Sequence, residues 1–105
     1  MNNSSRKQFA SFKEFYPFYL SEHSNDTNRR LHFVGTSGVI VLLCMVLLSQ
    51  RWGLLWAIPV LGYGFAWVGH FVFEKNRPAT FQHPIYSLIS DFVMWRDILV
   101  RRLPW

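Results

Sequence analysis

Two uncharged stretches decide the fold: FVGTSGVIVLLCMVLL at residues 33–48 and GLLWAIPVLGYGFAWVGHFVF at residues 53–73. Roughly 20 apolar residues cross a bilayer as a helix, and about 17 is the lower limit. A short polar break, Ser49 to Trp52, separates them. Because backbone groups in lipid must be paired within their own segment, both stretches are expected to be helices. The sequence therefore predicts an all-α integral membrane protein built on a hairpin of two transmembrane helices, with spans at about residues 33–49 and 53–73.

The rest of the composition agrees with this interpretation. The chain has 105 residues, which suits a single membrane domain covering residues 1–105. Half of the residues are hydrophobic, and they are concentrated between Phe33 and Phe73, whereas a soluble domain spreads its core residues with a helix or strand period. A buried hairpin in a soluble α protein is the alternative, but uncharged runs of this length are unusual there. Because the first 32 residues are polar and charged, no cleaved signal peptide is expected.

The formal net charge is +5, and the basic residues are distributed unevenly. Ten of the eleven flank the hairpin, and only Arg51 lies in its turn. Because positive residues stay on the cytoplasmic side, we expect a multi-pass protein with both termini cytoplasmic. Nucleic-acid binding is another use of a basic chain. Here the charges flank membrane spans, so anionic lipid headgroups are the simpler partner and no nucleic-acid partner is predicted.

The segment before the hairpin predicts an amphipathic helix in the membrane interface. Residues 1–5 resemble an irregular start, and an aromatic stripe then lies beside polar residues: Phe9, Phe12, Phe15, Tyr16, Phe18 and Tyr19. Pro17 is expected to kink or interrupt this helix. Alternatively, the aromatic residues simply cover the hairpin. Asn25 or Asp26 is expected to cap the following helix, which should run from about Thr27 to Leu48.

The segment after the hairpin is predicted to be a second interfacial helix. A polar loop from Glu74 to Pro84 precedes it, and residues 85–103 then carry apolar side chains at helical spacing: Leu88, Ile89, Phe92, Trp95 and Leu99. A third span is excluded, because Asp91, Arg96 and Asp97 would each cost roughly 3 kcal/mol in the bilayer core.

Three of the four histidines converge on one side of the predicted hairpin. A hairpin places the start of its first span level with the end of its second, so His32 and His70 lie at the same depth, and His23 lies just outside. Imidazole is the commonest metal ligand. Glu74 is four residues after His70 on the same helix face, and two histidines with a carboxylate suit non-haem Fe(II). A site of histidines alone suits zinc, copper, nickel or iron, so the spacing does not choose the metal.

Two further blocks of sequence resemble a known membrane family. They are FYLSEHSN at residues 18–25 followed by NRRLHFVGT at residues 28–36, and GYGFAWVGHFVFEKNRPATF at residues 62–81. With the tail from Pro84 to Trp95, the likeness covers most of the chain. The combination resembles the 2-hydroxy fatty acid dioxygenase family, typified by the yeast endoplasmic-reticulum dioxygenase of phytosphingosine breakdown. This chain resembles a compact form, since the eukaryotic members are longer and carry more membrane segments.

The resemblance implies an Fe(II)-dependent dioxygenase. Such an enzyme takes a 2-hydroxy fatty acid and molecular oxygen and leaves an acid one carbon shorter. Histidines matching His23, His32 and His70 are the expected iron ligands, and Glu74 matches an acidic position beside them, which makes it the candidate catalytic residue. His83 lies where no family histidine is expected and is left out of the site.

The substrate is expected to bind at the membrane interface. Its carboxylate would pair with Arg29 or Arg30, with Asn28 as a third candidate binding residue, and its chain would lie among Phe65, Trp67 and Phe71. Headgroup contacts are an equally good reading of the two arginines. A homodimer is one way in which a compact chain would complete an acyl pocket.

Two other functions remain open at this stage. One is a non-catalytic lipid-binding or adaptor protein whose histidines and arginines hold headgroups. The other is a metal-dependent enzyme of different chemistry, such as a zinc hydrolase. Family membership alone does not establish activity.

Overall fold

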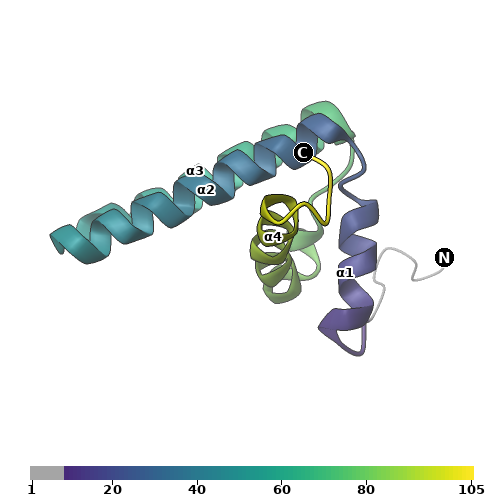
Figure 1. Ribbon diagram of the computed structural model, residues 1–105, viewed down its shortest axis with the longest axis horizontal. Coiled ribbons are helices and arrows are strands. Elements are labelled where there is room, and N and C mark those ends of the chain that lie inside the picture. Colours follow the sequence, from purple (N-terminus) through teal and green to yellow (C-terminus); the bar gives the residue numbers. More distant parts are fainter. Residues whose placement is uncertain (1–8) are drawn as a thin grey trace.

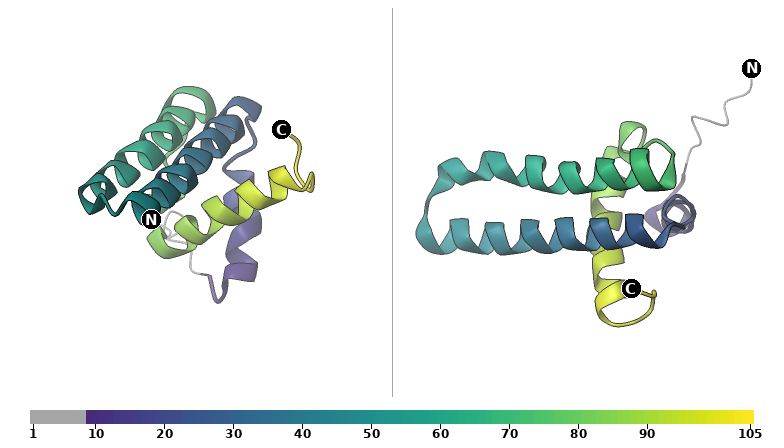
Figure 2. Two further views of the ribbon diagram at one scale, coloured as in Figure 1. Left: turned by 60° about the vertical axis from the view of Figure 1, so that its left-hand side comes forward. Right: turned by 90° about the horizontal axis from the view of Figure 1, so that it is seen from above.

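The computed structural model describes residues 9–105, which form helices joined by turns and short loops, with no strand in that range. The irregular start expected at residues 1–5 lies outside the described residues. Figures 1 and 2 show one long hairpin with two shorter helices gathered at its open end, where the C-terminus also lies. The all-α prediction is therefore confirmed.

The first arm of the hairpin is α2, Asp26–Ser49. Asn25 caps it, because the Asn25 side chain accepts a hydrogen bond from the Asn28 amide at 3.1 Å. The arm ends at Gln50, which adopts the left-handed conformation with φ 60°, and the chain then reverses direction. Both the predicted cap and the predicted bounds, residues 27–48, are confirmed to within one residue.

The second arm changes its helical winding along its length. It begins with the 3₁₀ turn η2 (Trp52–Trp56), continues as α3 (Ala57–Val68) and ends in the π-helical turn η3 (Gly69–Glu74). The arms pack closely, since a Cβ added at Gly35 would lie 2.9 Å from the Cβ of Phe65. The segments Asp26–Ser49 and Trp52–Glu74 are each long and apolar enough to cross a membrane.

Helices α1 (Phe12–Ser21) and α4 (Pro84–Leu99) run across the hairpin near its open end. Seen from above, α4 crosses the two arms nearly at right angles, whereas α1 is viewed end-on (Figure 2). A short 3₁₀ turn, η4 (Ala79–Phe81), leads into α4. This placement agrees with the sequence-based exclusion of a third span.

The core of this end lies between α1 and α4. It is formed by four buried side chains, Phe15, Tyr19, Met94 and Ile98. Two tyrosines of α1 also bond to aspartates of α4: the Tyr16 hydroxyl donates to Asp97 at 2.7 Å, and the Tyr19 hydroxyl donates to Asp91. Of the two alternatives for the aromatic stripe, the structure supports packing, but mainly against α4.

Of the two effects expected of Pro17, a kink or an interruption, the interruption is wrong, because α1 runs through Pro17. A proline removes the amide that would bond to the carbonyl four residues earlier, here that of Lys13. Lys13 and Pro17 are both exposed, so solvent can satisfy that carbonyl. The helix therefore continues through Pro17 to Ser21.

The apolar stripe predicted for α4 faces mostly outward. Leu88, Ile89 and Leu99 are exposed, whereas Trp95 packs on Phe33 and donates a hydrogen bond to the Ser37 hydroxyl at 2.9 Å. The buried side of α4 is instead partly polar, with Ser87, Ser90 and Asp97 on it. The helix thus presents mainly apolar side chains to its surroundings and a mixture of polar and apolar side chains to the protein.

Candidate metal centre

His23, His32 and His70 meet at the open end of the hairpin, as their topology predicted. His23 lies on the loop after α1, His32 on the second turn of α2 and His70 in η3, and all three are buried. Each offers one ring nitrogen, and the three nitrogens lie within 4.8 Å of one another. The Nε2 atoms of His23 and His32 are 3.2 Å apart. Nitrogens each about 2 Å from one metal ion are separated by about this distance.

The other ring nitrogen of each histidine is held by an oxygen. Nδ1 of His23 bonds to the Tyr19 carbonyl at 2.6 Å, and Nδ1 of His32 bonds to the Asn28 carbonyl at 3.0 Å. Nδ1 of His70 lies 2.6 Å from Oδ1 of Asn76. A carbonyl oxygen can only accept, so Nδ1 carries the proton in all three rings. In metal sites this arrangement fixes the tautomer and aims the free Nε2 at the ion.

The resulting electrostatics favour a cation. With Nδ1 protonated, neutral His23 and His32 direct two Nε2 lone pairs at each other across 3.2 Å. A proton is a poor solution, because burial, reinforced by the charges of His32 and His70, holds the pKa of His23 well below its usual value. A metal ion satisfies all three nitrogens without an imidazolium. The residues therefore fit a metal bound by three neutral histidines.

Asn76 is a site residue that sequence analysis did not identify. Lys75 ends η3 in the left-handed conformation, with φ 61°, and turns the chain back so that the Asn76 amide bonds to the His70 carbonyl at 3.0 Å. The Asn76 side chain then bridges two segments, because its Nδ2 donates to the Glu22 carbonyl at 3.1 Å while its Oδ1 faces His70. The left-handed conformation at Lys75 is a common way to end a helix, as at Gln50, and here it directs Asn76 toward His70.

Glu74 lies beside the cluster, but its carboxylate bonds elsewhere. Oε1 accepts from the Asn25 amide at 2.8 Å and from Nδ2 of Asn28 at 3.0 Å, and Oε2 accepts from the Ser24 hydroxyl at 2.7 Å. The free amides and positive end of the α2 dipole attract a carboxylate to this position. Glu74 thus ties the end of the second arm to the start of the first, and a catalytic role for it stays a prediction.

The three candidate substrate-binding residues are placed differently from one another. Asn28 is fully buried between Glu74 and the hairpin, and a Cβ added at Gly69 would lie 2.0 Å from its Oδ1. Arg29 donates to the carbonyls of His23 and Ser24, each at 3.0 Å, and pairs with Asp26. These bonds hold the His23 loop in place. Contact of Asn28 and Arg29 with the substrate stays a prediction.

Arg30 lies apart from the histidines. It is exposed, and its Cζ lies 5.6 Å from the centroid of the Trp105 ring. Its guanidinium donates a hydrogen bond to the Trp105 carbonyl at 3.3 Å. His83 is likewise outside the cluster, since its ring packs against Phe9 and Phe15. Leaving His83 out of the site agrees with this placement, and the role of Arg30 stays a prediction.

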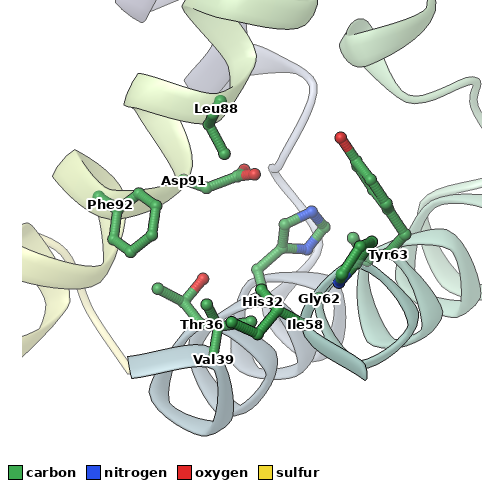
Figure 3. Close-up of a pocket in the computed structure, with 11 residues that line it drawn as sticks. His32, Thr36, Val39, Ile58, Gly62, Tyr63, Leu88, Asp91 and Phe92 are labelled. Atoms are coloured by element: carbon green, nitrogen blue, oxygen red, sulfur yellow. The ribbon is translucent and has the colours of Figure 1, made fainter. Parts of the chain in front are cut away.

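Two cavities adjoin the cluster, and α4 borders both. The smaller, about 10 Å³, is bordered by the three histidines together with Tyr19, Ser87 and Asp91. The larger, about 220 Å³, lies between the hairpin and α4, and Figure 3 shows His32, Thr36, Asp91 and Leu88 around it. Of the aromatic residues expected along the substrate chain, Trp67 borders the small cavity, and neither cavity is lined by Phe65 or Phe71.

Asp91 is the second site residue that sequence analysis did not identify as functional. Burial raises its pKa to about 7, against the lowering effect of the hydrogen bond from Tyr19. The Tyr19 ring in turn stacks on His23, with centroids 4.0 Å apart. An acidic residue between Leu88 and Phe92, on an otherwise apolar helix stripe, was the available signal.

The comparisons with known proteins agree with this geometry. A protein-family model described as 2-hydroxy-palmitic acid dioxygenase Mpo1-like matches residues 9–103. No match was found among curated proteins or among solved structures. The family match covers nearly the whole chain, including the three histidines, Asn76 and Asp91. The protein therefore belongs to the 2-hydroxy-palmitic acid dioxygenase Mpo1-like family.

Proposed function

We propose that this protein is a membrane-embedded, Fe(II)-dependent dioxygenase that removes the carboxyl carbon of 2-hydroxy fatty acids. The observation that carries the proposal is the convergence of three imidazoles whose Nδ1 atoms all donate to oxygen acceptors, which leaves three Nε2 lone pairs for one ion. The family name supplies the reaction class. His23, His32 and His70 are the proposed ligands.

The chain's own groups hold these ligands in place. When bound, Fe(II) supplies redox chemistry with molecular oxygen and open positions for substrate, as in other non-haem iron oxygenases. Asn76 fixes the ring of His70, and the backbone carbonyls of Tyr19 and Asn28 fix the other two rings. Glu74 supports the ligands indirectly, because its hydrogen bonds hold η3 against the start of α2.

The reaction balances without a separate reductant. One oxygen molecule and one 2-hydroxy acid contain the atoms of the shorter acid, carbon dioxide and water. The carbon–carbon bond to the carboxyl group breaks, the carbinol carbon is oxidised to the new carboxyl, and oxygen is fully reduced. The partners required are therefore the fatty acid and oxygen, both of which partition into lipid.

We further propose that the hairpin crosses the membrane with both termini on the cytoplasmic side. The hairpin exposes many apolar side chains, including Val41 at 58%, Leu48 at 87% and Val60 at 64%, and an apolar surface of this extent is unusual in a water-soluble monomer. The cluster at the open end would then lie at the cytoplasmic interface, which the flanking basic residues favour. A homodimer stays a prediction.

Oxygen uptake tests the reaction directly. The purified protein, loaded anaerobically with Fe(II) in lipid nanodiscs, is given oxygen with 2-hydroxyhexadecanoic acid or with unhydroxylated hexadecanoic acid. We expect uptake and pentadecanoic acid formation with the hydroxy acid alone. Substrate turnover that is unaffected by removing oxygen would identify a hydrolytic metal enzyme instead. An iron-loaded protein with no turnover of 2-hydroxy acids of any chain length would support the lipid-binding alternative.

A further inference from the structure

Asp91 lies beside the histidine cluster. Its carboxyl group is not needed for metal binding by the three histidines. It borders both the small cavity that the histidines line and the larger cavity next to it. Its Oδ1 accepts from the Tyr19 hydroxyl, and within residues 9–105 no lysine or arginine forms an ion pair with it. A half-buried carboxyl without a cation is costly in a structure and is commonly kept for function.

Ser87 adds an unpaired polar group to the same space. Its side chain is 1% exposed, its hydroxyl has no hydrogen-bond partner, and it borders the small cavity together with Asp91 and the histidines. Buried polar groups in native proteins nearly always have a partner, so an unpaired hydroxyl at a cavity indicates a missing ligand or water. The cavity is large enough for about one small polar group.

The larger cavity has the character of an alkyl-chain site. From His32 and Asp91 it extends toward the hairpin turn along the apolar residues Val39 and Ile58. Seven residues separate His32 from Val39, which is about 10 Å along an α-helix. Leu88 and Phe92, on the α4 side of the cavity, are exposed, so the cavity opens to the surroundings of the hairpin. Polar groups at one end and apolar walls along the rest fit a single-chain amphiphile.

We propose that Asp91 accepts a hydrogen bond from the 2-hydroxyl of the substrate while the cavity beyond it takes the acyl chain, so that Asp91 selects hydroxy acids over plain fatty acids. This inference rests on the proposed function and adds the substrate's orientation. The substrate carboxylate points away from Asp91, because two carboxylates in a poorly solvated space repel each other. Ser87 is placed to bond to the same polar head.

Binding measurements without oxygen test this inference apart from turnover. The Fe(II)-loaded full chain in nanodiscs is titrated with 2-hydroxyhexadecanoic acid and with hexadecanoic acid, which differ only in the hydroxyl. At pH 8, where Asp91 with its pKa of about 7 is mostly ionised, the wild type is expected to bind the hydroxy acid about tenfold more tightly, the effect of one hydrogen bond to a charged group. Asp91→Leu is expected to bind both acids equally and to retain its iron. Asp97→Asn, an aspartate of the same helix that borders neither cavity, is the matched control and keeps the preference.

A second variant keeps the test valid if Asp91→Leu does not fold. Asp91→Asn preserves the shape of the side chain but removes its charge, and its preference should fall to about threefold. Val39→Phe fills the far end of the cavity and should weaken binding of the 16-carbon hydroxy acid at least tenfold while sparing the 8-carbon one.

The outcomes separate this inference from the proposed function. Suppose that the wild type binds iron and consumes oxygen. A full tenfold preference in the Asp91 variants, or an unchanged chain-length profile in Val39→Phe, would then overturn this inference alone. A wild type that binds no iron and shows no preference for the hydroxyl would overturn both.

Discussion

The two ends of the hairpin differ in what stabilises them. At the open end, polar side chains that are buried or half-buried bond across segments beside the apolar core: His70 to Asn76, Glu74 to Asn28 and Tyr19 to Asp91. At the turn end, apolar residues such as Leu48 and Trp56 are exposed at 87% and 69%. The open end is therefore organised by the protein itself, whereas the turn end needs an apolar solvent. In the proposed topology a membrane provides that solvent and the polar end lies at its surface, where the proposed amphiphilic substrates would bind.

The largest predicted effect concerns the turn half of the hairpin. Val41→Asp places a charge on an exposed position of α2, which water would tolerate but which costs about 3 kcal/mol inside a bilayer. We expect the variant to be lost from the alkali-resistant membrane fraction, measured by carbonate extraction. Gln82→Asp, at an exposed site outside the hairpin, is the matched control and should remain inserted. Equal extraction of the two variants would contradict a lipid-facing hairpin.

The next effect distinguishes two glycines of the second arm. Gly69→Ala would bring a Cβ to 2.0 Å from the Asn28 Oδ1, so packing at the open end must shift at a cost of about 2 kcal/mol. A Cβ at Gly64 meets nothing within 4 Å, so Gly64→Ala should leave stability unchanged or raise it by about 0.5 kcal/mol. Thermal unfolding in detergent measures both. If Gly64→Ala were the more damaging substitution, the described packing would be wrong.

A third prediction concerns the support of His70. Asn76→Ala removes the acceptor of the His70 Nδ1 proton, and losing such a partner lowers metal affinity by about 10-fold to 100-fold. Asn76→Asp keeps an acceptor oxygen and should retain most of the affinity. Competition with a chelator of known affinity measures the loss. An Asn76→Ala protein with wild-type affinity would show that this bond does not orient the ring.

The smallest effect is predicted for Glu74. Glu74→Gln keeps the side chain's shape and one acceptor but removes the charge at the start of α2, which should cost about 1 kcal/mol of stability. Metal affinity should change less than in Asn76→Ala, because no ligand loses its partner. A loss of metal as large as that of Asn76→Ala would instead support the direct role at the metal predicted from sequence.

The sequence predicted the hairpin and the depth of its histidines for the same physical reason. Two uncharged runs separated by a short break allow only one topology, and that topology brings His32 and His70 level whatever the details of packing. The position of His23 followed, because only a few residues join it to α2. Hydrophobic patterning therefore predicted the hairpin and the meeting of the three histidines at its open end.

The remaining parts of the site depend on features that patterning does not reveal. The π-helical turn and the left-handed Lys75 place Asn76 against His70, and neither has a clear signal in the sequence. Glu74 shares a helix face with His70, yet the amides at the start of α2 attract its carboxylate instead. Asp91 reaches the cluster only because α4 packs across the hairpin, and the spacing within α4 does not specify that partner.

Metal content tests the central claim most directly. The wild type, His70→Ala and His83→Ala are purified anaerobically, loaded with Fe(II), freed of unbound metal and analysed for iron. We predict near-stoichiometric iron in the wild type and in His83→Ala, whose ring packs against aromatic residues outside the cluster, and almost none in His70→Ala. Iron retained by His70→Ala at the wild-type level, or absent from a correctly folded wild type, would contradict the three-histidine metal centre.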